Sequence, residues 1–293
     1  MKPKSADLHA HSHCSDGTLS PSDLVKKAAE SGIHALSITD HDTTAGIPEA
    51  EAAGLLYGVE IVPGMEISAL HPSGTLHILG YYIDIHDKFL QDNLRKYIFA
   101  RERRNPLILQ KLHELGYPLE IEEVKALAGG EVVNRPHIAR AMLRRGYVQS
   151  IQESFDRFLA NGAPAFAPKE IFTPEEAISF IHQAGGLAVI AHPDQLYADS
   201  MEQTLNEIRR LAAVGIDGVE AYHGACRSDF AECYAALAGE LGLIVTGGSD
   251  FHGDSKHKNL GETEALPYIP YTFVESMKKR LAENKNSIVP TLS

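Results

Sequence analysis

The chain has 293 residues, of which 44% are hydrophobic and 23% are charged. This composition is typical of a globular protein and excludes disordered, collagen-like and low-complexity chains. The formal net charge of −12 argues against nonspecific binding to the phosphate backbone of a long nucleic acid. Fifteen histidines stand beside three cysteines and no tryptophan, so any metal site is expected to use nitrogen and oxygen ligands.

No membrane or targeting segment is apparent in the sequence. The first residues lack the apolar stretch of a signal peptide, and no apolar run approaches the roughly 20 residues that cross a bilayer. We therefore expect a soluble, cytoplasmic protein that does not bind membranes. Nothing in the sequence indicates an obligate protein partner.

Short apolar runs alternate with helix-like stretches over the first 97 residues. Ser20 is a predicted helix N-cap because Pro21 follows it at the first helical position, and Gly32 ends that helix. A second, alanine-rich helix is expected to end at Tyr57. The strands expected in this part are 6–9, 35–39, 60–66 and 76–81. Strands that alternate with helices predict an α/β fold with a largely parallel sheet.

Residues 98–170 show a different pattern, in which short helices follow one another without strands. The expected helices are 101–116, 121–128, 136–146 and 151–161. This segment contains 11 Lys and Arg against 9 Asp and Glu, a net charge of +2, which leaves −14 for the rest of the chain. We therefore expect a helical insertion or cap domain at 98–170, inserted into an α/β domain made of 1–97 and 171–293.

The alternation of strands and helices returns at Thr173, where Pro174 and Glu176 complete a helix capping box. The strands expected from there on are 187–191, 218–221 and 243–247. Helices are expected at 201–214, at 272–284 and in a stretch that ends at Leu241.

Most of the expected strands end in His, Asp or Glu. The carboxyl ends of parallel strands meet at one face of an α/β protein, where catalytic residues collect. His9 and His11 are two residues apart on one strand and so point to the same side. His77, taken alone, fits a surface or core histidine equally well. The candidate metal ligands, enough for two or three ions, are His9, His11, Asp16, His41, Glu66, His77, His192, Asp250 and His252.

Five segments resemble the motifs of the PHP family, the polymerase and histidinol phosphatase domain, which is related to amidohydrolases. They are DLHAHSHCSDG (7–17), ITDHD (38–42), GMEIS (64–68), AHP (191–193) and SDFH (249–252). The resemblance implies a distorted (β/α)7 TIM-like barrel with a centre of two or three divalent metal ions. Mn²⁺ is the expected ion, with Zn²⁺ and Fe²⁺ as alternatives, because nitrogen and oxygen ligands suit all three.

The resemblance also implies how the candidate ligands are divided among the metals. Glu66 would bridge the first and second ions. The implied groups are His9, His11, Glu66 and Asp250 for one ion; Glu66, His77 and His192 for a second; and Asp16, His41 and His252 for a third.

Paired divalent ions lower the pKa of a bound water and neutralise the oxygens of a phosphoryl group. The expected nucleophile is therefore metal-bound hydroxide. Arg135 stands beside Asn134 at the start of an expected helix, where it could grip a phosphate, although a plain surface arginine is the alternative. His223, at a strand end, could bind phosphate or protonate the leaving oxygen, and a purely structural histidine is nearly as good an interpretation.

A chain of this size whose helical segment carries NRPHIA (134–139) is most similar to the nucleotide and RNA phosphoesterase branch of the family. We expect it to remove the 3′-phosphate from a nucleoside 3′,5′-bisphosphate, converting pAp to AMP and phosphate. The partner would then be a small nucleotide or short RNA, and not a long nucleic acid. The alternatives are a 5′→3′ exoribonuclease of short 5′-phosphorylated RNA, a histidinol phosphate phosphatase, a non-catalytic metal-binding PHP module and an amidohydrolase that cleaves a C–N bond.

Overall fold

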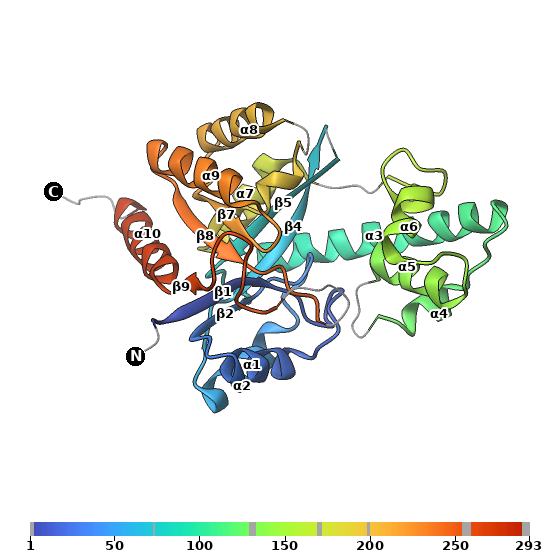
Figure 1. The fold of residues 1–293 in the computed structure, drawn as a ribbon, viewed down its shortest axis with the longest axis horizontal. Coiled ribbons are helices and arrows are strands. Elements are labelled where there is room, and N and C mark those ends of the chain that lie inside the picture. The colour runs from blue at the N-terminus through green and yellow to red at the C-terminus, as the bar shows by residue number, and fades with distance from the viewer. Residues whose placement is uncertain are drawn as a thin grey trace.

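The strands of the computed structural model form two sheets at the centre of the molecule (Figure 1). The structure describes residues 3–72, 74–128, 133–168, 172–197, 200–253 and 259–288. The four-stranded sheet has the order β3-β2-β1-β9, with the bounds Glu60–Ile61, Ala35–Ile38, Ser5–Ala10 and Ile269–Pro270. The five-stranded sheet has the order β4-β5-β6-β7-β8, with the bounds Gly64–His71, Gly74–Tyr81, Leu187–Ile190, Gly218–His223 and Ile244–Gly248.

The strand pairing confirms the expected parallel arrangement for most neighbouring strands and corrects it for β5 and β9. β1 pairs in parallel with β2, and β6, β7 and β8 are parallel to one another, but β5 is antiparallel to both β4 and β6. The reason is the short connection between His71 and Gly74, because strands joined by a tight hairpin must run in opposite directions. The single strand expected at 60–66 is also wrong: it is divided between β3 and β4, with Pro63, which has no N–H to donate, at the break.

The two sheets meet at two narrow seams and, among the described residues, do not close into one continuous barrel. Ala10 at the end of β1 pairs with Phe251, which follows β8. His41, which follows β2, pairs with Glu66 of β4. Both seams lie at the ends of strands that carry candidate metal ligands.

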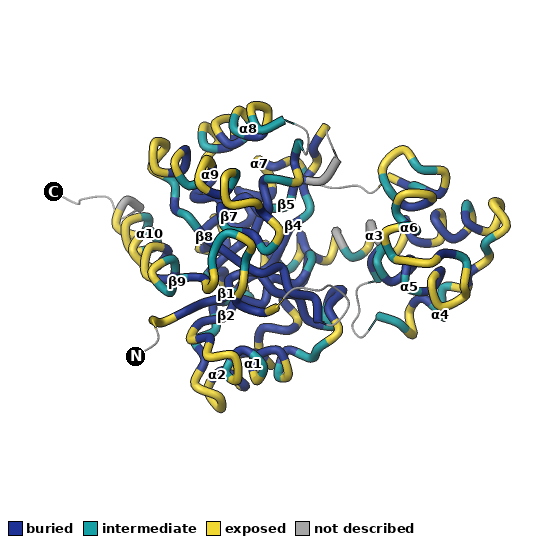
Figure 2. The backbone as a smooth tube through the Cα atoms, in the orientation of Figure 1, coloured by how far each residue is buried: buried dark blue, intermediate teal, exposed yellow. Residues whose placement is uncertain are grey.

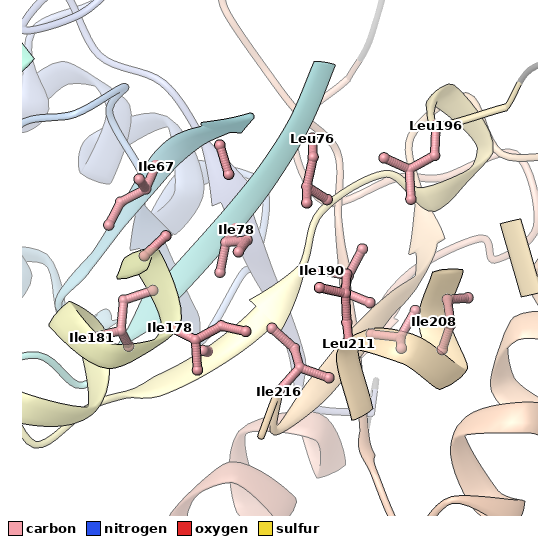
Figure 3. Close-up of a cluster of buried hydrophobic side chains, with 14 of the residues drawn as sticks. Ile67, Leu76, Ile78, Ile178, Ile181, Ile190, Leu196, Ile208, Leu211 and Ile216 are labelled. Atoms are coloured by element: carbon pink, nitrogen blue, oxygen red, sulfur yellow. The ribbon is translucent and has the colours of Figure 1, made fainter. Parts of the chain in front are cut away.

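Helices pack around the sheets and bury their apolar faces. Figure 2 shows buried strands at the centre and helices whose outer sides are exposed. Behind the five-stranded sheet, Ile67 and Ile190 contribute to a cluster with Ile181 and Leu211 from the covering helices (Figure 3). The helices of this part are α1 (Pro21–Glu30), α2 (Ile47–Tyr57), α7 (Pro174–Gln183), α8 (Met201–Ala213), α9 (Ser228–Glu240) and α10 (Thr272–Ile288).

The remaining helices lie to one side of the sheets (Figure 1). They are α3 (Lys88–Glu114), α4 (Ile121–Lys125), α5 (Arg135–Arg144), α6 (Ile151–Ser154) and a following π-helical turn (Phe155–Leu159). They have an apolar core of their own that includes Ile108, Leu112 and Met142. Although α3 is 27 residues long, neither it nor any other described helix is apolar enough to cross a membrane.

Helix α3 begins earlier than the sequence indicated. The helix expected to start at 101 starts at Lys88, where the Asp87 side chain accepts a hydrogen bond from the Leu90 N–H at 2.7 Å. The expected domain boundary at 97–98 therefore falls inside a continuous helix, and the second boundary at 170–171 lies outside the described residues.

Candidate metal centre

The structure brings all nine expected ligands into one cluster at the ends of the strands. His9 belongs to β1, and His11 and Asp16 follow it; His41 follows β2. Glu66 and His77 belong to β4 and β5, His192 follows β6, and Asp250 and His252 follow β8. Most of these side chains are buried; His41 and His77 keep a small exposed fraction.

Glu66 is the centre of this cluster. Its Oε1 lies 2.7 Å from His77 Nδ1 and 2.9 Å from His192 Nε2. Its Oε2 lies 3.0 Å from His41 Nδ1, 3.3 Å from His11 Nε2 and 3.4 Å from His9 Nε2. Each oxygen thus faces a different set of imidazoles, which is the arrangement a carboxylate needs to bridge two cations.

Three groups of side chains within the cluster have ligand atoms close enough to hold an ion each. The groups are His9, His11 and Asp250; His41, Glu66 and His77; and His11, Asp16, His41 and His252. These groups overlap with the expected ones, but His11 and His41 each belong to two groups instead of one. The side chains therefore fit a multinuclear metal site.

The orientation of His9 supports the same conclusion. Its Nδ1 lies 2.9 Å from Glu220 Oε1, so that nitrogen carries the proton that the carboxylate accepts. The lone pair is then on Nε2, which faces Nε2 of His11 at only 3.1 Å. Two imidazole nitrogens that converge in a buried site can share a cation. Glu66 Oε2 also makes no hydrogen bond to any described residue, although it is buried among imidazoles.

The electrostatics of the cluster keep its carboxylates ionised. Burial opposes ionisation of Glu66, but its electrostatic interactions with the imidazoles of His77, His41 and His9 hold the pKa of Glu66 well below its usual range. The pKa of Asp16 is likewise held low, because His252 and His41 outweigh the effect of burial. Burial lowers the pKa of His77 to about 4 despite the opposing charge of Glu66. Against the effect of burial, neighbouring carboxylates raise the pKa of His11 to about 9 and that of His9 well above its usual value. Because metals bind ionised carboxylates and neutral imidazoles, metal binding would release protons from these two rings.

Several carboxylates that support the cluster were missed by the sequence analysis. Glu220, buried in β7, contacts His9 Nδ1 and accepts a hydrogen bond from the His192 main-chain N–H at 2.9 Å. Asp7 accepts hydrogen bonds from the main-chain N–H groups of Ser249 and Gly261 at 3.0 and 2.7 Å. An acidic residue inside an otherwise apolar strand, such as Glu220 between Val219 and Ala221, is the signal that could have identified them.

Asp40 supports the loop after β1 in a similar way. Its Oδ1 accepts hydrogen bonds from the Ser12 main-chain N–H at 2.8 Å and the Ser15 hydroxyl at 2.6 Å. Its Oδ2 accepts the Ser12 hydroxyl at 2.5 Å. Because this loop carries His11 and Asp16, the fully buried Asp40 fixes the position of two candidate ligands.

The backbone is strained where some ligands are presented. His192 has a φ of 27° and Asp250 has a φ of 53°. Both values lie in the left-handed region, which residues other than glycine rarely adopt. Such strain costs on the order of 1–3 kcal/mol for each residue and persists where surrounding structure imposes it. Here it turns two candidate ligands into the cluster.

The residues expected to contact substrate occupy different surroundings. His223 is fully buried beside the cluster, with Nε2 3.4 Å from Asp250 Oδ2. Arg135 is the first residue of α5; its guanidinium donates to the Leu159 carbonyl at 3.0 Å and lies 5.8–5.9 Å from the ring centres of Phe155 and Phe166.

Asn134 precedes Arg135 at the start of α5 and is buried. Its main-chain N–H donates to His137 Nδ1 at 3.0 Å. This bond belongs to the N-terminal cap of α5, so Asn134 also has a local structural role.

One further residue of α5 reaches the cluster. Arg140 Nη2 donates to the main-chain carbonyl oxygen of Asp16 at 2.5 Å. The sequence analysis did not identify Arg140, since a bond to a main-chain oxygen 124 positions away leaves no pattern in the sequence.

The comparison with protein families gives the cluster its context. The family model described as the PHP domain matches residues 7–220. The chain belongs to the PHP family. Together with the cluster of ligands, this membership makes it a metal-dependent phosphoesterase, as the sequence analysis expected.

Two of the relatives of this PHP protein have different activities in their names. A 5′-3′ exoribonuclease of Haemophilus influenzae is 39% identical over 249 residues, which cover 85% of this chain and 90% of the relative. A 3′,5′-nucleoside bisphosphate phosphatase of Chromobacterium violaceum is 34% identical over 274 residues, which cover 90% and 93%. A solved structure of an amidohydrolase from Chromobacterium violaceum, with bound sulfate and no metal, has a TM-score of 0.84 at 31% identity, covering 94% of this chain and 96% of the other.

Proposed function

We propose that this PHP protein removes the 3′-phosphate from a nucleoside 3′,5′-bisphosphate such as pAp, giving AMP and phosphate. The observation that carries the proposal is the buried cluster around Glu66, whose two oxygens face separate groups of imidazoles. The named activity of the Chromobacterium violaceum phosphatase supports the choice of substrate. The sulfate in the solved relative supports a site for a tetrahedral oxyanion.

We propose that two or three divalent ions, Mn²⁺ first and Zn²⁺ or Fe²⁺ as alternatives, are held by the nine clustered side chains. When bound, they would supply positive charge for the phosphoryl oxygens and acidify a water molecule. Glu220 orients His9 for this role, and Asp40 holds the loop of His11 and Asp16.

His223 and Arg135, with Asn134 beside it, are the proposed substrate residues. His223 is buried next to Asp250, where its ring can hold a proton for the leaving oxygen. Arg135 is proposed because it stands at the first position of α5, where a guanidinium and a helix N-terminus both suit phosphate oxygens.

We further propose that 1–97 with 171–293 form a distorted seven-stranded barrel, capped by 98–170. The order β1, β2, β4, β5, β6, β7, β8 returns to β1 through the seams at His41–Glu66 and Ala10–Phe251, which supports the barrel. The separate apolar core of α3–α6 and the contact of Arg140 with Asp16 support the cap.

An exoribonuclease acting on short RNA is the second candidate, and the Haemophilus influenzae relative favours it. Such an enzyme needs aromatic side chains on which a second base can stack. Tyr117 instead packs against Tyr147 and Phe158, with ring centres 5.5 and 4.7 Å apart, inside the helical segment. This packing supports the smaller substrate.

The test is a comparison of kcat/KM on pAp and on a 5′-phosphorylated dinucleotide with metal-replete protein. We expect pAp to be preferred. A preference of more than tenfold for the dinucleotide would replace the proposed function with the exoribonuclease. Histidinol phosphate belongs in the same panel, and bound metal without turnover of any phosphoester would indicate a non-catalytic module.

A further inference from the structure

Arg140 brings a guanidinium to the edge of the metal centre. Its Nη2 donates to the carbonyl oxygen of Asp16 at 2.5 Å, and the carboxylate of Asp16 lies 3.3 Å from His252 Nε2. Arg140 is half-buried. The positively charged guanidinium of Arg140, which belongs to the helical segment, is therefore hydrogen-bonded to the main chain of a candidate metal ligand.

The charge of Arg140 is not neutralised by any carboxylate among the residues that the structure describes. By contrast, Arg145 pairs with Glu123 and Arg157 pairs with Glu153. A guanidinium has five N–H donors in a rigid plane, and the bond to Asp16 is the one hydrogen bond that Arg140 makes within the described residues. The other donors remain available to an anion.

We propose that Arg140 binds the phosphate of the substrate that is not hydrolysed, the 5′-phosphate of a nucleoside 3′,5′-bisphosphate. This inference rests on the proposed function, because it takes the scissile 3′-phosphate to lie at the metal centre. The second phosphate of the same nucleoside must then lie near the rim of that centre. Arginine is suited to this position because its planar fork binds phosphate oxygens in pairs.

The bond to Asp16 explains why this arginine can be selective. It fixes one N–H of the guanidinium, so less side-chain freedom is lost when a phosphate binds. Arg140 therefore makes the enzyme prefer a bisphosphate over a nucleoside 3′-monophosphate.

The test compares Arg140→Met with Arg144→Met on two substrates, pAp and 3′-AMP, which lacks the 5′-phosphate. Arg144 is a matched control because it is an exposed residue of the same helix. We expect Arg140→Met to lower kcat/KM on pAp by about 10- to 100-fold, the usual effect of losing a hydrogen bond between charged groups. On 3′-AMP the loss should stay below about threefold, and Arg144→Met should leave both substrates unchanged.

Equilibrium binding gives a second readout that does not depend on turnover. The metal-replete parent should bind AMP more tightly than adenosine, and Arg140→Met should lose that preference. Arg140→Lys keeps the charge but not the planar fork, so it should retain part of the preference for AMP. If Arg140→Met does not fold, Arg140→Lys replaces it in both assays.

If Arg140→Met lowers kcat/KM equally on pAp and 3′-AMP, Arg140 only positions the Asp16 loop and the inference is wrong. An unchanged kcat/KM on both substrates would also overturn it. If the parent itself does not hydrolyse pAp, the proposed function fails. The AMP and adenosine titrations then still show whether Arg140 recognises a 5′-phosphate.

Discussion

Glu66 joins the two halves of the metal centre, and this role follows from its position in the chain. Glu66 belongs to β4 of the five-stranded sheet. Its main-chain N–H donates to the carbonyl of Asp40, a residue that follows β2 of the four-stranded sheet. Its side chain is buried and meets imidazoles that come from both sheets. A single side chain thus connects the geometry of the sheets to the geometry of the ligands.

Glu66→Gln should remove most of the bound metal and most of the activity. The amide keeps the shape of the side chain but loses the negative charge that compensates two cations. We expect metal content per chain to fall by at least one ion, measured by elemental analysis after desalting, with kcat on pAp reduced about 100-fold or more. The control is Glu232→Gln on the exposed side of α9. Full metal content in Glu66→Gln would contradict the bridging role.

Glu220 shows what the sequence could not reveal at the residue scale. The nine candidate ligands were predictable because most of them stand in short, recurring motifs at or near the ends of strands. Glu220 lies within β7 and contacts His9, which is 211 positions away in the chain. Its role depends on how close β7 comes to β1, which belongs to the other sheet, and that approach is set only when the two sheets have formed.

Glu220→Gln should weaken metal binding while leaving the fold intact. The neutral amide accepts a weaker hydrogen bond from His9 Nδ1 than the carboxylate does, so the His9 ring is less well oriented and less basic. Loss of such a supporting group typically costs about 10- to 100-fold in metal affinity. Competition with a chromophoric chelator measures the affinity, and circular dichroism checks the fold. An affinity equal to that of the parent would show that Glu220 does not position His9.

At the scale of elements, the sequence predicted most helices and strands but not how the strands pair. The Thr173 capping box and the Ser20–Pro21 helix start are local signals, and the structure has both. The antiparallel β5 was missed because its direction depends on a hairpin, not on the residues of the strand. The start of α3 was missed because its first turns belong to the main core: Leu90 and Leu94 pack into the cluster behind the five-stranded sheet, and the helix then continues into the helical segment.

Gly248 shows how closely two elements approach at the centre. A Cβ at this position of β8 would lie 2.1 Å from Cβ of His9 and 2.8 Å from Oε1 of Glu220. Gly248→Ala should therefore push His9 out of place, reduce metal binding and destabilise the fold by about 1–3 kcal/mol. Urea unfolding and metal analysis measure both effects.

Gly239→Ala provides the matched comparison for that substitution. Gly239 lies inside α9, and nothing lies within 4 Å of the Cβ that alanine would add. Alanine should raise the free energy of unfolding by about 0.4–1 kcal/mol there, because it restricts the unfolded chain and favours helix. If both substitutions have the same effect, the close approach of β8 to β1 is not what constrains Gly248.

At the scale of the whole molecule, the acidic charge of −12 takes on a specific meaning. Part of it comes from Asp16, Glu66 and Asp250, which are buried together at one end of the strands. Burying several carboxylates costs free energy unless cations or protons compensate them. An acidic protein can thus act on phosphate esters when metal ions supply positive charge at the site, and its overall stability becomes linked to those ions.

Removal of the metals should therefore lower both activity and stability. Ligands that bind only the folded state stabilise it by about 2.7 kcal/mol when their concentration is a hundred times the dissociation constant. For a chain of this size, that corresponds to a melting temperature roughly 5 °C or more above that of the chelated protein. Differential scanning calorimetry after chelation and again after adding Mn²⁺ measures the shift. In Glu66→Gln the shift should be smaller, because fewer ions bind. A melting temperature that is the same with and without metal would show that the buried charges are compensated within the chain itself.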